Sequence, residues 1–345
     1  MKKRLPHDFY RDAEEKIDVG EVAFVERAVA WIESKTYDTI FPPLKGLDLV
    51  PVDTSVPPGA AVYMYRQYTL VGAARLVNAR GGDVPLVNAF VKEFSRKFYR
   101  LGAAYEYTID EMLEAQLSQS RGLGISIDMT KAKAAKNAIA RGLDYVAAVG
   151  SAPITAIAGL TQGIGADVGM VGIINLPNAI VYTIPQGIQG DTRWITKTPD
   201  EKVADIAGLL ASIFVGTYEA FKGNTVLIPT EQFVAAGAQR MGDGSDETVI
   251  SFALRTLSKI YPGLTIDSWP FLTGAGTAGA AGVGVRSDRM IAFNRDPNLV
   301  RLMVSEEFRQ EPPQYNNWEI KILCSAKTAG VVSPYPISVA VADGI

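Results

Sequence analysis

The first strongly patterned stretch of the chain is rich in β-branched and aromatic residues. Valine, tyrosine and threonine dominate Ala61–Val71, which favours a β-strand. Further along, Arg80–Asp83 reads Arg-Gly-Gly-Asp, a turn sequence. The pattern predicts a strand that turns back on itself as a β-hairpin.

The returning segment has a four-residue spacing that fits a strand or a helix. Phe90, Phe94 and Phe98 recur at this spacing, with Lys92 and Arg96 between them. On a strand all five share one face, although the same spacing also suits a helix. As strands, each arm of a hairpin over residues 60–108 would reach roughly 50–60 Å at about 3.3 Å per residue.

This hairpin supplies the candidate functional residues. A lone two-stranded ribbon is marginal in water, so we expect it to lie on a neighbouring subunit. Its aromatic side chains would supply the apolar area of the contact with that subunit. The charged residues at its tip would supply polar contacts. The candidates for inter-subunit contact are Tyr63, Tyr65, Arg80, Asp83, Phe90, Phe94 and Phe98.

Two consecutive helices are predicted after the hairpin. Thr108 and Glu111 form a capping box that starts a helix running to about Ser118. Asp128 caps a second helix, Met129–Val149, with a glycine as its stop. The second helix carries a stripe expected to be buried, made of Ala132, Ala135, Ile139, Leu143 and Val146.

The middle of the chain predicts a second, α/β domain inserted into the first. Thr198–Glu201 begins a helix to about Phe221, with proline at its first position. A strand at Asn224–Pro229 and a helix at Asp246–Lys259 follow. After residue 290 the pattern returns to strands, at Met290–Phe293, Leu299–Val304, Trp318–Cys324 and Val331–Ala342.

The N-terminal part begins as a polar arm over residues 1–19. Glu21–Lys35 then has the apolar spacing of a helix. Asp48–Val52 is a short apolar strand candidate, and Val56–Gly59 follows it as a turn.

Composition narrows the function classes. The 345 residues suggest about two domains of roughly 150 residues each. A net charge of −3 disfavours extensive phosphate binding, because proteins that coat nucleic acid are usually basic. The chain has neither a run of the ~18 apolar residues that span a bilayer nor an apolar N-terminal signal segment. We expect a soluble intracellular protein without membrane partners.

Residues able to do chemistry are sparse. The single histidine, His7, and the single cysteine, Cys324, cannot supply a zinc site. A Ser-His-Asp triad would need His7, in the polar arm. Cys324 lies in an apolar stretch and is expected to be a small buried hydrophobe. No catalytic residue, metal site or cofactor is predicted.

One glycine-rich motif would support a different function, that of an enzyme that binds a dinucleotide. Gly274–Gly279 matches the G-x-G-x-x-G dinucleotide fingerprint, and Asp296 stands about 20 residues on. The residues that follow, Ala280–Val285, are too glycine-rich for the helix the fingerprint needs. We therefore predict a flexible loop at Leu272–Val285 in which Gly276→Ala changes nothing. A nucleotide-dependent oxidoreductase remains the alternative from another class.

Several short segments of the sequence, in their order along the chain, resemble segments of a known protein family. They are Val50–Gly59, Ala104–Met112, Lys131–Ala135, Arg289–Pro297, Glu311–Gln314 and Tyr335–Ile345. With the order of predicted elements, they resemble the Hong Kong 97-type major capsid proteins of tailed bacteriophages, in the encapsulating-protein branch. The resemblance covers about residues 20 to 345. It departs at Ser118–Gly124, which is longer than expected between the two helices.

The resemblance implies an α+β capsid fold with named parts. These are an N-terminal arm (1–45), a peripheral domain with the spine helix (46–59, 109–150 and 290–345), an extended loop (60–108) and an inserted axial domain (151–289).

It also implies a structural protein, not an enzyme, without cofactor. Hexamers and pentamers of the chain would close an icosahedral shell, assembled in the host cytoplasm, around double-stranded DNA bound without sequence specificity. The resemblance is also compatible with separate scaffolding, portal and decoration proteins as partners of the shell. Because no lysine lies between Ala60 and Val91, a covalent cross-link from the loop tip is not expected. An encapsulin-type compartment shell, with the same fold, is the nearest alternative.

Overall fold

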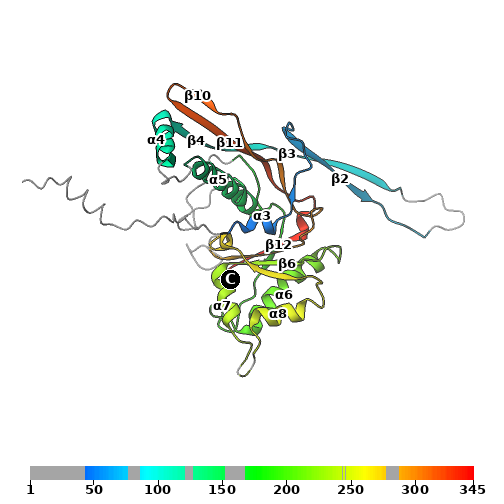
Figure 1. Ribbon diagram of the computed structural model, residues 1–345. Coiled ribbons are helices and arrows are strands. Elements are labelled where there is room, and N and C mark those ends of the chain that lie inside the picture. The colour runs from blue at the N-terminus through cyan, green and yellow to red at the C-terminus, as the bar shows by residue number, and fades with distance from the viewer. Residues whose placement is uncertain are drawn as a thin grey trace, which may run out of the picture.

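The structure is a computed structural model that describes residues 43–76, 86–120, 127–151, 168–242, 244, 246–276 and 287–345. Within these residues the chain forms two five-stranded sheets and a long two-stranded hairpin that projects from the body (Figure 1). The predicted helix Glu21–Lys35, His7, Arg80 and Asp83 lie outside the described residues.

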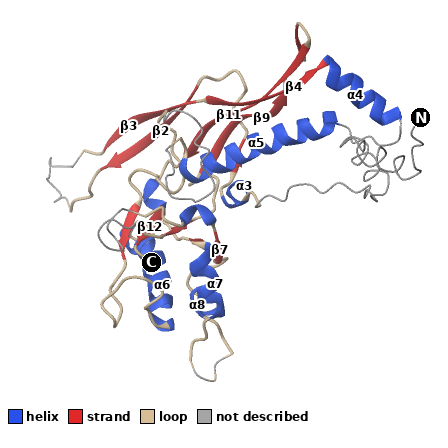
Figure 2. Cartoon of the chain, turned by 90° about the vertical axis from the view of Figure 1, so that its left-hand side faces the viewer, coloured by secondary structure: helices blue, strands red, loops and turns tan. Residues whose placement is uncertain are grey.

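The first sheet combines early and late parts of the sequence. Its strands are β1 (Val52–Asp53), β4 (Tyr99–Thr108), β9 (Arg301–Gln310), β10 (Gln314–Asn316) and β11 (Glu319–Val332). β11 pairs antiparallel with β4, β9 and β10, while β1 pairs parallel with β9. The helix α5 (Ile127–Val149) runs along one face of this sheet (Figure 2). The predicted stripe faces the sheet: all its members are buried except Ala132, which is partly buried.

The second sheet lies between two hydrophobic cores. Its order is β5 (Ile180–Thr183), β12 (Val339–Asp343), β8 (Arg289–Phe293), β6 (Thr225–Ile228) and β7 (Thr265–Ser268). Along β8, Ile291 and Phe293 join the core under α5. Met290 and Ala292 face the opposite core. That core also contains residues of α6 (Pro199–Gly216), α7 (Thr230–Ala238) and α8 (Val249–Leu257).

Residues 290–345 contribute strands to both sheets, with β9, β10 and β11 in the first. β8 and β12 belong to the second sheet, where they pair with each other and β8 also pairs with β6. The predicted strand Val331–Ala342 is wrong as a single element. Two prolines, Pro334 and Pro336, interrupt it, because proline cannot continue a strand ladder. β11 therefore ends at Val332 and β12 starts at Val339.

The short strand predicted at Asp48–Val52 is wrong, because Asp48 and Leu49 end a helix and only Val52 belongs to a strand. α3 spans Lys45–Leu49, and β1 begins only at Val52. The Gly46 amide donates to the Asp144 carboxylate of α5 over 2.5 Å, and Leu49 is buried in the core. A five-residue helix is too short for apolar periodicity to reveal, so its contacts decide its form.

The predicted start of α4 (Ile109–Ser120) and the predicted end of α5 are confirmed, whereas Asp128 lies inside α5, which begins at Ile127, and does not cap it. The Glu111 amide donates to the Thr108 hydroxyl at 3.2 Å, and the Thr108 amide donates to the Glu111 carboxylate at 3.3 Å. This confirms the capping box of α4. α5 stops at Gly150, whose φ is +73°.

The second domain differs from prediction in its helices and in two strands, β5 and β7, that were not predicted. α6 ends at Gly216 instead of about Phe221, because Tyr218 and Glu219 adopt positive φ values. The helix α7 directly after β6 was not predicted.

Candidate functional site

The hairpin predicted to bind a neighbour is present but shorter than expected. β2 (Val62–Val71) and β3 (Asn88–Lys97) pair antiparallel over their whole length. The segment in which Phe90 and Phe94 recur is therefore a strand and not a helix. Residues 99–108, expected in the hairpin, form β4 and pair with β11 in the first sheet. Ten residues reach about 33 Å, so the strands fall short of the predicted reach.

The first face of the hairpin carries the aromatic candidates. Tyr65 lies opposite Phe94, and their rings stack with centroids 5.2 Å apart. Phe90, opposite Thr69, is 53% exposed, and Phe94 is 40% exposed. Tyr63 and Tyr65 are half-buried near the body. Apolar exposure thus increases away from the subunit.

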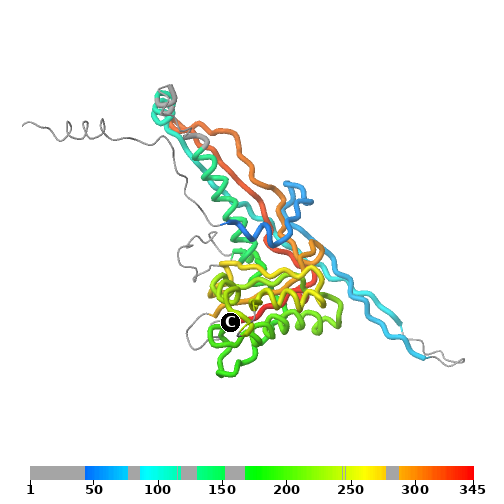
Figure 3. Tube along the Cα trace, turned by 60° about the horizontal axis from the view of Figure 1, so that its bottom comes forward, coloured from blue at the N-terminus to red at the C-terminus, as the bar shows by residue number. Residues whose placement is uncertain are grey.

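The second face is also apolar and uncovered. Met64, Tyr68, Leu70 and Val91 are each more than half exposed there. An ion pair between Arg66 and Glu93, with 2.6 Å between nitrogen and oxygen, crosses the same face. Figure 3 shows the ribbon extending away from both sheets. Several exposed apolar side chains on one projecting ribbon are characteristic of an interaction site.

Phe98 does not belong with these candidates. Its side chain is only 8% exposed and packs against Met303, Ala329 and Val332 of its own subunit. It lies between β3 and β4, where the chain passes from the hairpin into the first sheet. The four-residue spacing that grouped it with Phe90 and Phe94 could not distinguish the root of the hairpin from its free part.

Charged residues that sequence analysis missed hold the hairpin root. The Arg301 guanidinium donates to the Tyr63 hydroxyl at 2.6 Å and lies 3.5 Å from the Asp53 carboxylate. Burial alone would raise the pKa of Asp53. Hydrogen bonds from Ser55 and the positive charge of Arg301 outweigh burial, so this pKa lies below its usual value. Arg301 is 238 residues from Tyr63 in sequence, so no local pattern could have identified the contact.

The glycine motif shows no phosphate cradle in its described part. The Gly274 amide donates to the Asp288 carboxylate at 2.9 Å, and the Gly276 amide donates to the Ser287 carbonyl at 2.8 Å. A phosphate site needs such amides to point at the ligand. Leu272, at the start of the predicted flexible loop, is fully buried.

The prediction that Gly276→Ala changes nothing is also wrong. A Cβ at Gly276 would lie 2.3 Å from the Ser287 hydroxyl oxygen and 2.7 Å from the Ser287 carbonyl oxygen. Because Ser287 is buried, we expect Gly276→Ala to lower the free energy of unfolding by roughly 1–2 kcal/mol. Urea denaturation of the subunit measures this. Gly242→Ala is the control, since a Cβ there meets nothing within 4 Å. Equal stability of the two variants would contradict the expected clash.

Other candidate chemistry is sparse among the described residues. They contain no group of three or more His, Cys, Asp and Glu side chains placed to hold a metal ion. Cys324 is buried, as expected, and burial raises the pKa of its thiol. No helix in the described part of the chain is long and apolar enough to cross a membrane.

Comparison with known proteins identifies the group to which this hairpin and these two sheets belong. Residues 72–345 match the sequence model of the family described as major capsid protein. The chain belongs to the major capsid protein family. No curated protein matches the sequence.

Solved capsid structures share the fold at low sequence identity. The capsid protein of Myoviridae phage XM1 superposes with a TM-score of 0.72 at 14% identity, covering 92% of this chain and 98% of the other. A chain from Mycobacterium phage Ogopogo gives 0.57 at 13% identity, covering 93% and 98%. A chain of an empty GTA particle capsid gives 0.54 at 10% identity, covering 93% and 97%. The expected Hong Kong 97-type fold of a shell-forming phage capsid protein is confirmed.

Proposed function

We propose that this major capsid protein closes an icosahedral shell of hexamers and pentamers around the double-stranded DNA of a tailed bacteriophage. The observation that carries the proposal is the hairpin β2–β3. Both of its faces carry apolar side chains that, beyond the Tyr65–Phe94 pair, remain largely exposed on the single subunit. A ribbon of this kind gains stability when another copy covers it.

In the proposed contact the hairpin lies on the body of the next subunit. The two copies then contribute different surfaces, which is a head-to-tail contact (Figure 1). Heterologous contacts of this type generate closed rings when the rotation closes. Burying one large apolar side chain contributes roughly 1.5–3 kcal/mol, and each copy in a shell repeats the contact.

The charge of the chain fits enclosure of DNA without tight binding. A net charge of −3 gives no general attraction for phosphate, so the inner wall would hold DNA by confinement. We propose a purely structural role, without catalysis, in the virion capsid, with assembly in the host cytoplasm. Scaffolding, portal and decoration proteins are the additional partners that this role would involve.

The test is assembly of a hairpin variant against a matched control. Phe90→Asp removes an exposed ring that makes no ring contact within the described subunit, and it adds a charge to the contact face. Asn88→Asp adds the same charge two residues away, on the same face, without removing apolar area.

Negative-stain microscopy and sedimentation of the purified protein should show shells for the parent protein and for Asn88→Asp. Phe90→Asp should remain unassembled, with the unfolding temperature of the subunit unchanged. Shells formed equally well by Phe90→Asp would contradict the hairpin contact. A parent protein that stays monomeric under these conditions would contradict the shell. Protein cargo in place of nuclease-protected DNA would indicate a compartment shell.

A further inference from the structure

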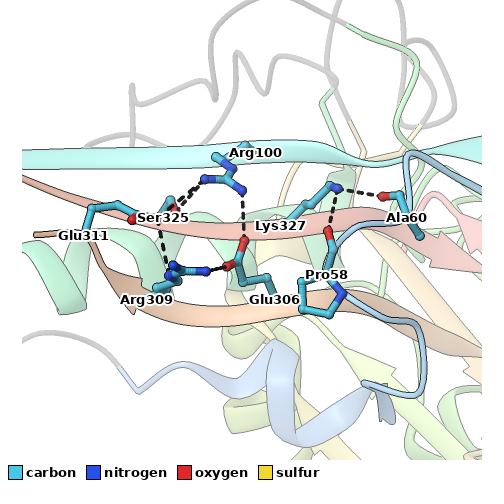
Figure 4. Close-up of polar contacts among 8 residues, drawn as sticks. All are labelled: Pro58, Ala60, Arg100, Glu306, Arg309, Glu311, Ser325 and Lys327. Carbon is cyan, nitrogen blue, oxygen red and sulfur yellow. Dashed lines mark hydrogen bonds and ion pairs between the residues drawn. The ribbon is translucent and has the colours of Figure 1, made fainter.

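A lysine of the first sheet holds the backbone at the point where the chain enters the hairpin. Lys327, on β11, donates from Nζ to the Pro58 carbonyl at 2.9 Å and to the Ala60 carbonyl at 2.6 Å (Figure 4). Both carbonyls lie just before β2 begins at Val62. Hydrogen bonds from a charged donor are stronger than neutral ones, so this contact ties the hairpin to the sheet beneath it.

Lys327 is available for these carbonyls because the neighbouring carboxylates already have partners. Its cross-strand neighbours are Arg100 on β4 and Glu306 on β9. Glu306, only 8% exposed, pairs with Arg100 at 3.0 Å and with Arg309 at 3.2 Å. The same two arginines also lie within 4 Å of Glu311, at 3.8 and 3.4 Å (Figure 4). With the carboxylates neutralised by guanidinium groups, the ammonium reaches the loop backbone instead.

The other side of the root is held by packing. The Phe98 amide donates to the Ala61 carbonyl at 3.0 Å, which closes the base of the hairpin. The Phe98 ring is buried, and the Lys327 ammonium lies 5.8 Å from its centre. Pro57 and Pro58 further restrict the backbone, because proline fixes φ. The root is therefore held from both strands, whereas the distal ribbon has few contacts with its own subunit.

We propose that Lys327 is a positioning residue for assembly, which fixes the direction of the hairpin before any neighbour binds. The inference rests on the proposed function and names the residue that controls its geometry. A rotation of about 10° at the root would move the end of a strand about 33 Å long by roughly 6 Å. A displacement of this size would place the apolar faces out of register with the next subunit. Holding the root in advance also removes an ordering cost from each contact.

The first test measures the root in unassembled subunits. Lys327→Met removes the ammonium but keeps a chain of similar length over Phe98. Lys321→Met is the matched control, an exposed lysine on the same strand and the same face. Hydrogen exchange of the Ala60 and Phe98 amides, both hydrogen-bonded at the root, should become about tenfold faster in Lys327→Met and stay unchanged in Lys321→Met. Equal exchange in the parent and Lys327→Met would overturn the proposal.

The second test measures the particles. Electron microscopy should show shells of one diameter for the parent and for Lys321→Met, and a mixture of diameters or open sheets for Lys327→Met. Lys327→Arg, which retains a cation able to donate to both carbonyls, should restore the single diameter. Uniform shells of parental size from Lys327→Met would show that the neighbour sets the direction, and the proposal would be wrong. If the parent forms no shells, the proposed function fails, and the exchange experiment still decides whether Lys327 holds the root.

Discussion

Replacing Lys197 with methionine should lower the free energy of unfolding of the subunit by about 3–5 kcal/mol. Lys197 and Asp205 form an ion pair with 2.7 Å between nitrogen and oxygen, and their side chains are 1% and 2% exposed. Lys197 also donates to the Pro185 carbonyl at 2.8 Å. Trp194 donates its indole N–H to the same Asp205 oxygen at 2.9 Å. Removing the lysine leaves a buried carboxylate with no opposite charge, which is the costly way to break such a pair.

The double variant Lys197→Met/Asp205→Asn isolates the effect of the unpaired charge, because the asparagine amide oxygen can still accept from the Trp194 indole. Because it removes both charges, it should recover most of the stability lost by the single variant. Arg255→Met is the control for an exposed pair. Arg255 lies 2.7 Å from Glu247 on the surface, and its loss should cost about 0.2–1 kcal/mol.

Urea unfolding followed by tryptophan fluorescence is the measurement, because Trp194 is fully buried beside Asp205. A Lys197→Met variant no less stable than Arg255→Met would mean that the buried pair does not hold this domain together.

The sequence contains no sign of this ion pair, although it predicts the elements around it. Thr198–Glu201 was predicted to begin α6 with proline at its first position. The structure confirms this start and adds a capping box between Thr198 and Glu201. Lys197 and Asp205 flank that box as ordinary charged residues. Helix caps are local interactions between residues three positions apart, so they can be recognised in the sequence. Burial of a particular charge depends on tertiary packing, which local patterns do not encode.

The same distinction applies to the hairpin. Its first strand could be predicted because its composition favours β-structure over ten residues, whereas the phenylalanine spacing of the second fitted a strand or a helix. Its root could not, because Lys327 reaches Pro58 across 269 positions of sequence. The predicted contact surface was therefore correct in placing Phe90 and Phe94 on an exposed ribbon and wrong in placing Phe98 there. Whether a neighbour covers Phe90 and Phe94 stays a prediction.

The unfolding free energy of the subunit should fall as the pH rises from about 4 to about 6, because of Asp144. Asp144 lies on α5 and is 5% exposed. Burial raises the pKa of its carboxyl to about 6, and the negative charge of Asp48 adds to this, although the Gly46 hydrogen bond opposes it. In the unfolded chain the pKa returns to its ordinary value of 3.8. The folded state therefore binds the proton more tightly between these two pH values.

The direction of the pH effect on stability follows from this difference in pKa between the folded and the unfolded state. Below about pH 4 the carboxyl is protonated in both states, and its burial carries no charge penalty. As the pH rises through 6, the folded state has to ionise a buried group that the unfolded chain ionises in water. The stability present at low pH is lost over this window, by about 2–3 kcal/mol for a shift of this size. Above about pH 7 the contribution is constant.

Asp144→Asn should remove this dependence and make the subunit more stable at pH 7 and above. An asparagine keeps the oxygen that accepts the Gly46 amide but carries no charge. Urea denaturation of unassembled subunits at several pH values between 4 and 8 would compare the variant with the parent. Asp48→Asn should give an intermediate result, because it removes only the repulsion and leaves the burial of Asp144. Parallel pH curves for the parent and Asp144→Asn would show that this carboxylate is hydrated in the folded subunit, and that the contact between α3 and α5 carries no buried charge.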